Sequence, residues 1–149
     1  MVKTPPIRAD CLICRREEGD AELHRIPVWE DARWRLTTSL YSEIPGFSYL
    51  EPKRHVPYVT ELDGEEARTL GGVLARTTKA LKEVTGAELV YVLVFGGHIQ
   101  HLHIHLAPHV RGGPPIGDIF DRLASEAPLR SEQELRSIAD RARQRLAAA

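Results

Sequence analysis

The sequence predicts an α+β fold in which an antiparallel sheet carries one long helix and is followed by a C-terminal helix. Short apolar segments lie between turn-forming residues, and two longer segments repeat apolar residues at helical spacing. A chain of 149 residues with 42% hydrophobic content fits a single domain that needs no disulfides to bury a core. We expect one domain over 1–149, with an N-terminal arm (1–10), a core (11–109), a loop (110–130) and a C-terminal helix (131–149).

Several segments have the pattern of strands. The segments 33–38 and 47–50 flank the turn-forming Ile44-Pro45-Gly46, which predicts an antiparallel pair. The continuous apolar run from Leu89 to Phe95 is rich in valine, as expected of a central strand. Gly96 and Gly97 separate this run from the next strand, and so short a connection favours antiparallel pairing.

The long helix is the clearest element of the sequence. Asp63 and Glu66 have the spacing of a capping box, and Gly86 is a natural stop. Between them, apolar residues recur with a period near 3.6: Ala67, Leu70, Val73, Leu74, Leu81 and Val84.

A second helix is predicted from Glu132 to about Leu146, with Ser131 and Glu134 as its capping pair. Its inward side would carry Leu135, Ile138, Ala139, Ala142 and Leu146. The segment 111–115 before it, with two glycines and two prolines, is expected to be a loop.

Charge and cysteine usage exclude some classes of function. Lysine plus arginine (20) nearly balances aspartate plus glutamate (21), so no overall field attracts nucleic acid or a membrane surface. No apolar run approaches the ~18 residues of a membrane span, and the N-terminus lacks a signal-peptide core. Two cysteines three positions apart suit a reducing compartment, so we expect a cytoplasmic protein.

Histidines are concentrated in one short segment. Five of the seven lie between His98 and His109, and His101, His103 and His105 alternate with apolar residues. Because strand side chains alternate with period two, these three imidazoles would share one face, while the intervening Leu102, Ile104 and Leu106 would enter the core.

A row of three histidines on one strand face is compatible with three roles. Residues two apart on a strand are about 6.5–7 Å apart, so one tetrahedral zinc would not accept all three without distortion. A phosphate or phosphate chain suits the row better, with N–H donors around the oxygens and one nitrogen free to attack phosphorus. The alternative without function is a solvent-facing strand that happens to carry histidines.

The segment His101-Leu102-His103-Ile104-His105-Leu106-Ala107 resembles the H-φ-H-φ-H-φ-φ signature of the histidine triad family of nucleotide hydrolases and transferases. Upstream, Pro45 to Val56 is similar to the family's strand ending in a P-K-x-H turn, here Pro52-Lys53-Arg54-His55. The resemblance covers roughly Cys11 to His109. It implies an antiparallel sheet of about five strands with one long helix packed on it, to which this chain adds the C-terminal helix, and a homodimer.

The resemblance also implies roles for individual histidines. His103 would be the nucleophile that attacks the α-phosphorus of a dinucleoside polyphosphate or nucleoside phosphoramidate, forming a nucleotidyl-imidazole intermediate. His105 would contact the phosphate and stabilise the transition state. His98, three positions before the motif, could bind the substrate and protonate the leaving group, or could be a turn histidine facing solvent.

The Cys11-Leu12-Ile13-Cys14 motif is compatible with zinc ligation, thioredoxin-like redox chemistry or two unrelated thiols. No strand is expected before it, which favours zinc over the redox motif. The resemblance implies one structural Cys₂His₂ zinc site made by Cys11, Cys14, His55 and His101, with no organic cofactor. His24 is a substitute ligand or an ordinary surface residue.

The nucleoside subsite departs from the family pattern. Ser39 aligns with a position where relatives often hold the ribose with an acid, and the loop 94–98 lacks their asparagine. Ser39 and Trp34 are our candidates for substrate contact, and Trp29, Tyr41 and Phe47 could also line a base pocket, although aromatic residues in such strands are more often core. Arg111 could reach a phosphate or be solvated.

Three functions remain open from the sequence. The first is a nucleotide hydrolase or nucleotidyltransferase that acts through His103. The second is a nucleotide-binding or interaction module with little turnover. The third is a metal-dependent hydrolase that uses the histidine row as ligands. No nucleic-acid or membrane partner is expected for any of them.

Overall fold

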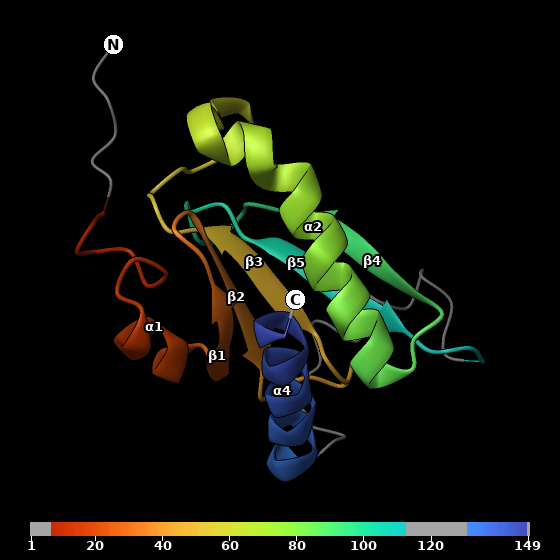
Figure 1. The fold of residues 1–149 in the computed structure, drawn as a ribbon. Helices are drawn as coiled ribbons and strands as arrows, with labels where there is room; N and C mark the ends of the chain where they lie inside the picture. Colours follow the sequence, from red (N-terminus) through yellow and green to blue (C-terminus); the bar gives the residue numbers. More distant parts are fainter. Residues whose placement is uncertain (1–6, 113–130, 149) are drawn as a thin grey trace.

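Five antiparallel strands form one sheet in the computed structural model, which describes residues 7–112 and 131–148 (Figure 1). The strand order across the sheet is β1-β2-β3-β5-β4. The bounds are Arg25–Glu30 for β1, Trp34–Ser39 for β2, Ser48–Pro52 for β3, Leu89–Val94 for β4 and Ile104–His109 for β5. The antiparallel pairing predicted for the two strands around the Pro45-Gly46 turn, and for the two around Gly96-Gly97, is confirmed.

The edge strand β1 was not among the strands that the pattern identified. Its pairing with β2 shifts between Pro27 and Trp29, so a bulge interrupts the alternation of inward and outward residues. Pro27 also lacks a backbone N–H, which sheets tolerate at an edge. Because of the bulge and the proline, the sequence lacks the alternation of apolar and polar residues from which a strand is predicted.

The long helix α2 spans Gly64–Thr85, as predicted, and ends at Gly86 in the left-handed conformation (φ 72°). The expected capping box is wrong, because the Asp63 side chain caps no backbone N–H. Its carboxylate instead accepts a 2.7 Å hydrogen bond from Arg54 Nη2, which also contacts the buried Glu66 carboxylate at 3.2 Å. Both acids thus tie the turn after β3 to the start of α2.

The C-terminal helix α4 spans Glu132–Ala147, and Ser131 caps it by accepting a 3.2 Å hydrogen bond from the Glu134 N–H, as expected. The predicted loop 110–130 lies outside the described residues beyond position 112. Helices α2 and α4 lie on the same face of the sheet (Figure 1). In the described part of the chain, no helix combines the length and apolar character needed to cross a membrane.

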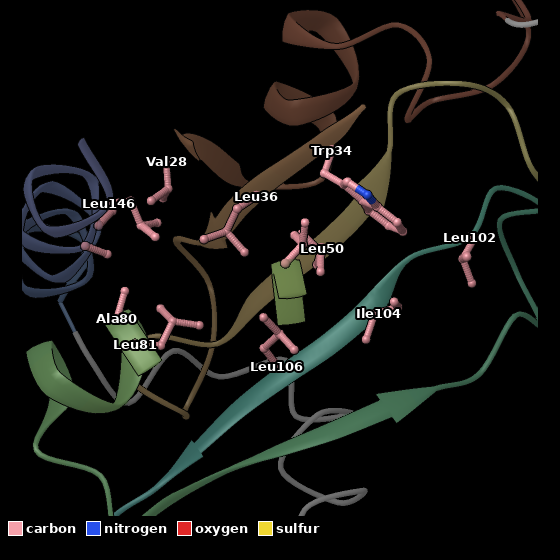
Figure 2. Packing of buried hydrophobic residues seen from close by; sticks show 13 residues of the cluster. Val28, Trp34, Leu36, Leu50, Ala80, Leu81, Leu102, Ile104, Leu106 and Leu146 are labelled. Atoms are coloured by element: carbon pink, nitrogen blue, oxygen red, sulfur yellow. The ribbon is translucent and has the colours of Figure 1, made fainter. Parts of the chain in front are cut away.

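The main core lies between these two helices and the sheet. Figure 2 shows its residues pointing inward from β1, β2, β3, β5, α2 and α4. Its buried members are Val28, Trp34, Leu36, Leu50, Val73, Ala80, Leu81, Leu102, Ile104, Leu106, Ala139, Ala142 and Leu146. The apolar residues between the histidines therefore enter the core as predicted, which sends His103 and His105 to the other face of the sheet.

A short N-terminal segment brings further groups to that other face. It contains the two cysteines and the helix α1 (Glu17–Glu22), and residues with positive φ stand at both ends of the helix, Arg16 at 50° and His24 at 51°. Asp20 of α1 is buried against the charged side chains of Arg25 in β1 and Arg35 in β2. A 3₁₀ turn, η1 (Val59–Glu61), joins β3 to α2.

Candidate functional site

Two cysteines and two histidines from three separate parts of the chain meet beside the sheet. Cys11 and Cys14 precede α1, His55 follows β3, and His101 precedes β5. One ligand atom from each lies within 4.8 Å of all the others, so the group could hold a metal ion. The sequence prediction of these four residues as neighbours agrees with the structure, although no strand passes through His101, because β5 begins three residues later.

The donor set fits zinc. His101 Nδ1 lies 3.5 Å from Cys11 Sγ and 3.4 Å from Cys14 Sγ, and His55 Nδ1 lies 3.4 Å from Cys14 Sγ. With zinc–sulfur and zinc–nitrogen bonds of 2.3 and 2.0–2.1 Å, a tetrahedral ion separates sulfur from nitrogen by about 3.5 Å. These three sulfur–nitrogen distances are therefore those expected between ligands of one ion.

The surroundings of the cluster suit ligation as well. His101 Nε2 lies 2.7 Å from the Pro52 carbonyl oxygen, which holds the ring with Nδ1 toward the sulfurs. Burial lowers the pKa of His101 to about 4, so the imidazole is neutral, as a ligand must be. Burial raises the pKa of Cys14 to about 11, which disfavours a thiolate unless a cation stabilises it.

His103 and His105 lie side by side next to this cluster, with ring centroids 5.1 Å apart. His103 Nδ1 is 2.7 Å from the main-chain oxygen of His101. Burial lowers the pKa of His103, which favours the neutral ring. Both histidines line a cavity of about 450 Å³ together with Ile13, Leu23, Arg25, Tyr49, Phe95, Gly96, Gly97, His98 and Ile99.

Aromatic rings surround His105. Phe47 stacks on it at 5.6 Å between centroids, Tyr49 meets it edge-on at 5.4 Å, and Phe95 lies at 4.9 Å. Its Nδ1 has no hydrogen-bond partner among the described residues, and burial lowers the pKa of the ring to about 4. The ring is therefore neutral and carries one N–H donor and one acceptor nitrogen.

His98 stands in the loop between β4 and β5 and is exposed. It lines the histidine cavity and also a smaller one of about 290 Å³ that borders Cys11 and His55. His98 is thus a turn residue that faces solvent, as one interpretation expected, and it also lies at the rim of the cavity, as the other expected.

Two predicted substrate contacts lie elsewhere. Trp34 is fully buried in the main core, and its indole N–H donates to Thr69 Oγ1 at 2.8 Å. It belongs to the helix-covered face, so the structure removes it from the candidates. Ser39 is buried at the end of β2, where its hydroxyl accepts from the Tyr41 N–H at 3.1 Å, and it does not line the histidine cavity.

The positions of the remaining candidate residues show whether they lie near the site. His24 is exposed beside Tyr41 and stands outside the cysteine cluster. Arg111 is exposed and lies 3.5 Å from Glu88. Trp29 packs on the main core under Arg76, whereas Phe47 stacks on the triad histidine His105.

Sequence reasoning missed several residues that line the cavity. Tyr49 could have been found, because it alternates with the core residue Leu50 and so must face the histidines. Arg25 could not, because β1 itself was hidden by its bulge. Ile13 and Leu23 reach the cavity through the fold of the N-terminal segment, which no local pattern announces.

Several solved structures of known proteins are similar to this chain. No model of a protein family and no curated protein matches the chain, but many solved structures do. A hypothetical histidine triad nucleotide-binding protein from Sulfolobus tokodaii is 23% identical, with a TM-score of 0.72, and the match covers 93% of each chain. A zinc-bound histidine triad family protein from Mycobacterium smegmatis is 22% identical, with a TM-score of 0.66, over 93% of this chain and 94% of the other.

A histidine triad family hydrolase from Clostridium thermocellum is 24% identical, with a TM-score of 0.57, over 73% of this chain and 98% of the other. Many structural neighbours therefore carry the histidine triad name, and one of them binds zinc. The five-stranded antiparallel sheet with its helices is the fold of these proteins, and the Cys₂His₂ cluster fits a zinc site. The chain thus has the fold of the histidine triad proteins.

Proposed function

We propose that this protein is a nucleotide hydrolase or nucleotidyltransferase that cleaves dinucleoside polyphosphates or nucleoside phosphoramidates at the α-phosphate. The observation that carries the proposal is the pair His103 and His105, set side by side at a cavity of about 450 Å³. A nucleophilic imidazole and a neighbouring N–H donor are what an in-line attack on phosphorus requires. Structural neighbours named nucleotide-binding protein and hydrolase support the proposal.

The reaction would proceed in two displacements at the α-phosphorus. The His103 Nε2 lone pair forms a bond to phosphorus while the bond to the leaving oxygen or nitrogen breaks, giving a nucleotidyl-histidine. His98, at the rim, protonates the leaving group. Water then attacks the same phosphorus and loses its proton to solvent while the phosphorus–nitrogen bond to His103 breaks, which releases the nucleoside monophosphate and free His103. Another acceptor in place of water would leave as its nucleotidyl derivative. His105 donates to a phosphate oxygen throughout.

We also propose that the cluster of Cys11, Cys14, His55 and His101 binds one structural zinc ion. Four protein ligands close the coordination shell, so the ion would organise the fold and leave no position for substrate. His101 would then fix the segment from which His103 projects. This assignment opposes a metal-dependent hydrolase, because His103 and His105 stand outside the metal-binding group found among the described residues.

A nucleotide-binding module with little turnover is the second candidate. It is favoured by one observation, that the residue aligned with the family's ribose-binding acid is Ser39, which is buried and is not among the residues that line the cavity. Such a protein would bind nucleotides without consuming them.

A substrate panel separates the two candidates. Purified protein is incubated with diadenosine and diguanosine polyphosphates and with nucleoside 5′-phosphoramidates, and release of nucleoside monophosphate is followed by chromatography. The enzyme proposal expects turnover by the wild type and at least a 10³-fold loss in His103→Ala. Binding without release by the wild type favours the binding module, and equal release by both proteins contradicts the role of His103.

A further inference from the structure

A network of four buried charges lies on the sheet face that carries the histidines. It consists of Asp20, Arg25, Arg35 and Glu51, whose side chains are at most 7% exposed. Arg25 Nη1 and Nη2 grip Glu51 at 2.9 and 2.8 Å, and its Nε donates to Asp20 at 2.9 Å. Arg35 donates to Asp20 through both Nη atoms. Two cations and two anions balance within the network.

The two arginines differ in one respect that bears on the site. Arg25 lines the histidine cavity, whereas Arg35 is not among the residues around it. The guanidinium carbon of Arg25 lies 5.5 Å from the centre of the Tyr49 ring. The three hydrogen bonds to Asp20 and Glu51 engage one N–H on each nitrogen, and each Nη carries a second N–H.

Tyr49 stands between Arg25 and the phosphate-binding end of the cavity. Its ring centroid is 5.4 Å from that of His105, and its strand β3 lies between β1, which carries Arg25, and β5, which carries His105. A phosphate held by His103 and His105 would therefore lie at the His105 end of this row, with Arg25 at the other end. What meets Arg25 is the part of the substrate that extends beyond the phosphate.

The charge balance indicates the chemistry of that part. The Asp20 and Glu51 carboxylates would repel an additional anion, and this repulsion offsets its attraction to the guanidinium. A neutral carbonyl oxygen gains hydrogen bonds from a fixed donor without that repulsion. We propose that Arg25 is a specificity-determining residue that donates to a carbonyl oxygen of the nucleobase, so that the enzyme selects bases such as guanine, hypoxanthine or uracil. This inference rests on the proposed nucleotide function.

The inference can be tested by calorimetric binding of three probes to the full-length, zinc-loaded protein: inosine 5′-monophosphate, purine riboside 5′-monophosphate, which lacks the carbonyl, and ribose 5-phosphate, which lacks the base. The wild type should bind inosine 5′-monophosphate about tenfold more tightly than the purine riboside nucleotide. This comparison needs no variant, so it holds even if a substitution in the network impairs folding.

Arg25→Lys and Arg35→Lys then form a matched pair, because both keep the charge of the network and lose the guanidinium fork. Arg25→Lys should abolish most of the tenfold preference while leaving the affinity for ribose 5-phosphate within twofold, and Arg35→Lys should preserve the preference. Equal affinities of the wild type for the two nucleotides overturn the inference. So does an equal loss in both variants, or a matching loss for ribose 5-phosphate. If the wild type binds no nucleotide, the proposed function itself fails.

Discussion

His103 Nδ1 lies 2.7 Å from the main-chain carbonyl oxygen of His101. A carbonyl only accepts, so Nδ1 carries the hydrogen, and in the neutral ring the lone pair is left on Nε2. The residue that supplies this carbonyl also directs its own Nδ1 to two cysteine sulfurs. The backbone carbonyl of the proposed metal ligand His101 thus orients the ring of the proposed nucleophile His103.

Zinc ligation by the cluster predicts loss of metal and of stability in Cys14→Ala. Elemental analysis of the purified wild type should find about one zinc per chain, and the variant should contain little. Loss of a structural ion costs several kcal/mol, which for a chain of this size lowers Tm by roughly 10 °C.

His103→Ala provides the control for this experiment, since it removes a triad histidine that is not part of the cluster. It should retain the full complement of zinc. A Cys14→Ala protein that keeps its metal while His103→Ala loses it would place the ion on the histidine row instead.

Gly19 predicts a strong packing constraint inside the N-terminal segment. A Cβ at this position would lie 1.6 Å from the Leu12 carbonyl oxygen, which belongs to the backbone and cannot rotate away. We therefore expect Gly19→Ala to reduce the free energy of unfolding, measured by urea titration, by about 3 kcal/mol or more.

The matched variant is Gly71→Ala in α2, where a Cβ meets nothing within 4 Å. Because glycine is a poor helix former, this change should stabilise the protein by about 0.5–1 kcal/mol. Similar effects of the two substitutions would show that α1 does not pack against Leu12 as described.

His98 is predicted to act on the leaving group. With a nucleoside phosphoramidate, whose amine must be protonated on departure, His98→Ala should reduce kcat by about 10²-fold or more. With a p-nitrophenyl ester of the same nucleotide, whose leaving group is stable as an anion, the loss should stay within about fivefold. His109→Ala, at the far end of β5 beside Tyr91, serves as the control. An equal loss on both substrates would assign His98 to binding.

The edge strand β4 predicts self-association. The expectation of a central strand for this apolar run is wrong, because β4 is the last strand of the sheet on its side. Leu89, Val92 and Val94 are accordingly 38%, 45% and 46% exposed. An apolar edge of this kind favours pairing with a second copy. Light scattering should find a dimer for the wild type and a monomer for Val92→Lys, while Val59→Lys, on the equally exposed η1, should remain dimeric. A monomeric wild type at tens of micromolar would contradict this expectation.

The residues around the proposed metal could be predicted from the sequence because their chemistry is distinctive. Cysteines and histidines at family spacings identified Cys11, Cys14, His55 and His101, and the alternation of 101–106 correctly assigned its apolar members to the core. The metal ligands were predicted from residue type and spacing. The core residues were predicted from the alternation of side-chain direction along a single strand.

The nucleoside side of the cavity could not be predicted in the same way. Aromatic character suggested Trp34 as a ligand contact, but the face of the strand decides, and Trp34 shares its face with Leu36. The pairing of Arg25 with Asp20 and Glu51 joins three elements and depends on a strand whose pattern a bulge disrupts. Contacts of this kind follow from tertiary packing, which a linear pattern does not contain.

The covalent state of His103 during turnover tests the proposed mechanism most directly. The wild type is mixed with a nucleoside phosphoramidate, quenched within the first turnovers under mildly alkaline conditions that preserve phosphoramidates, digested and mapped by mass spectrometry. Nucleophilic attack by His103 predicts one added nucleoside monophosphate, carried by His103, and no adduct in His103→Ala. Turnover without any adduct on the wild type, or an adduct on another residue that persists in His103→Ala, would contradict it.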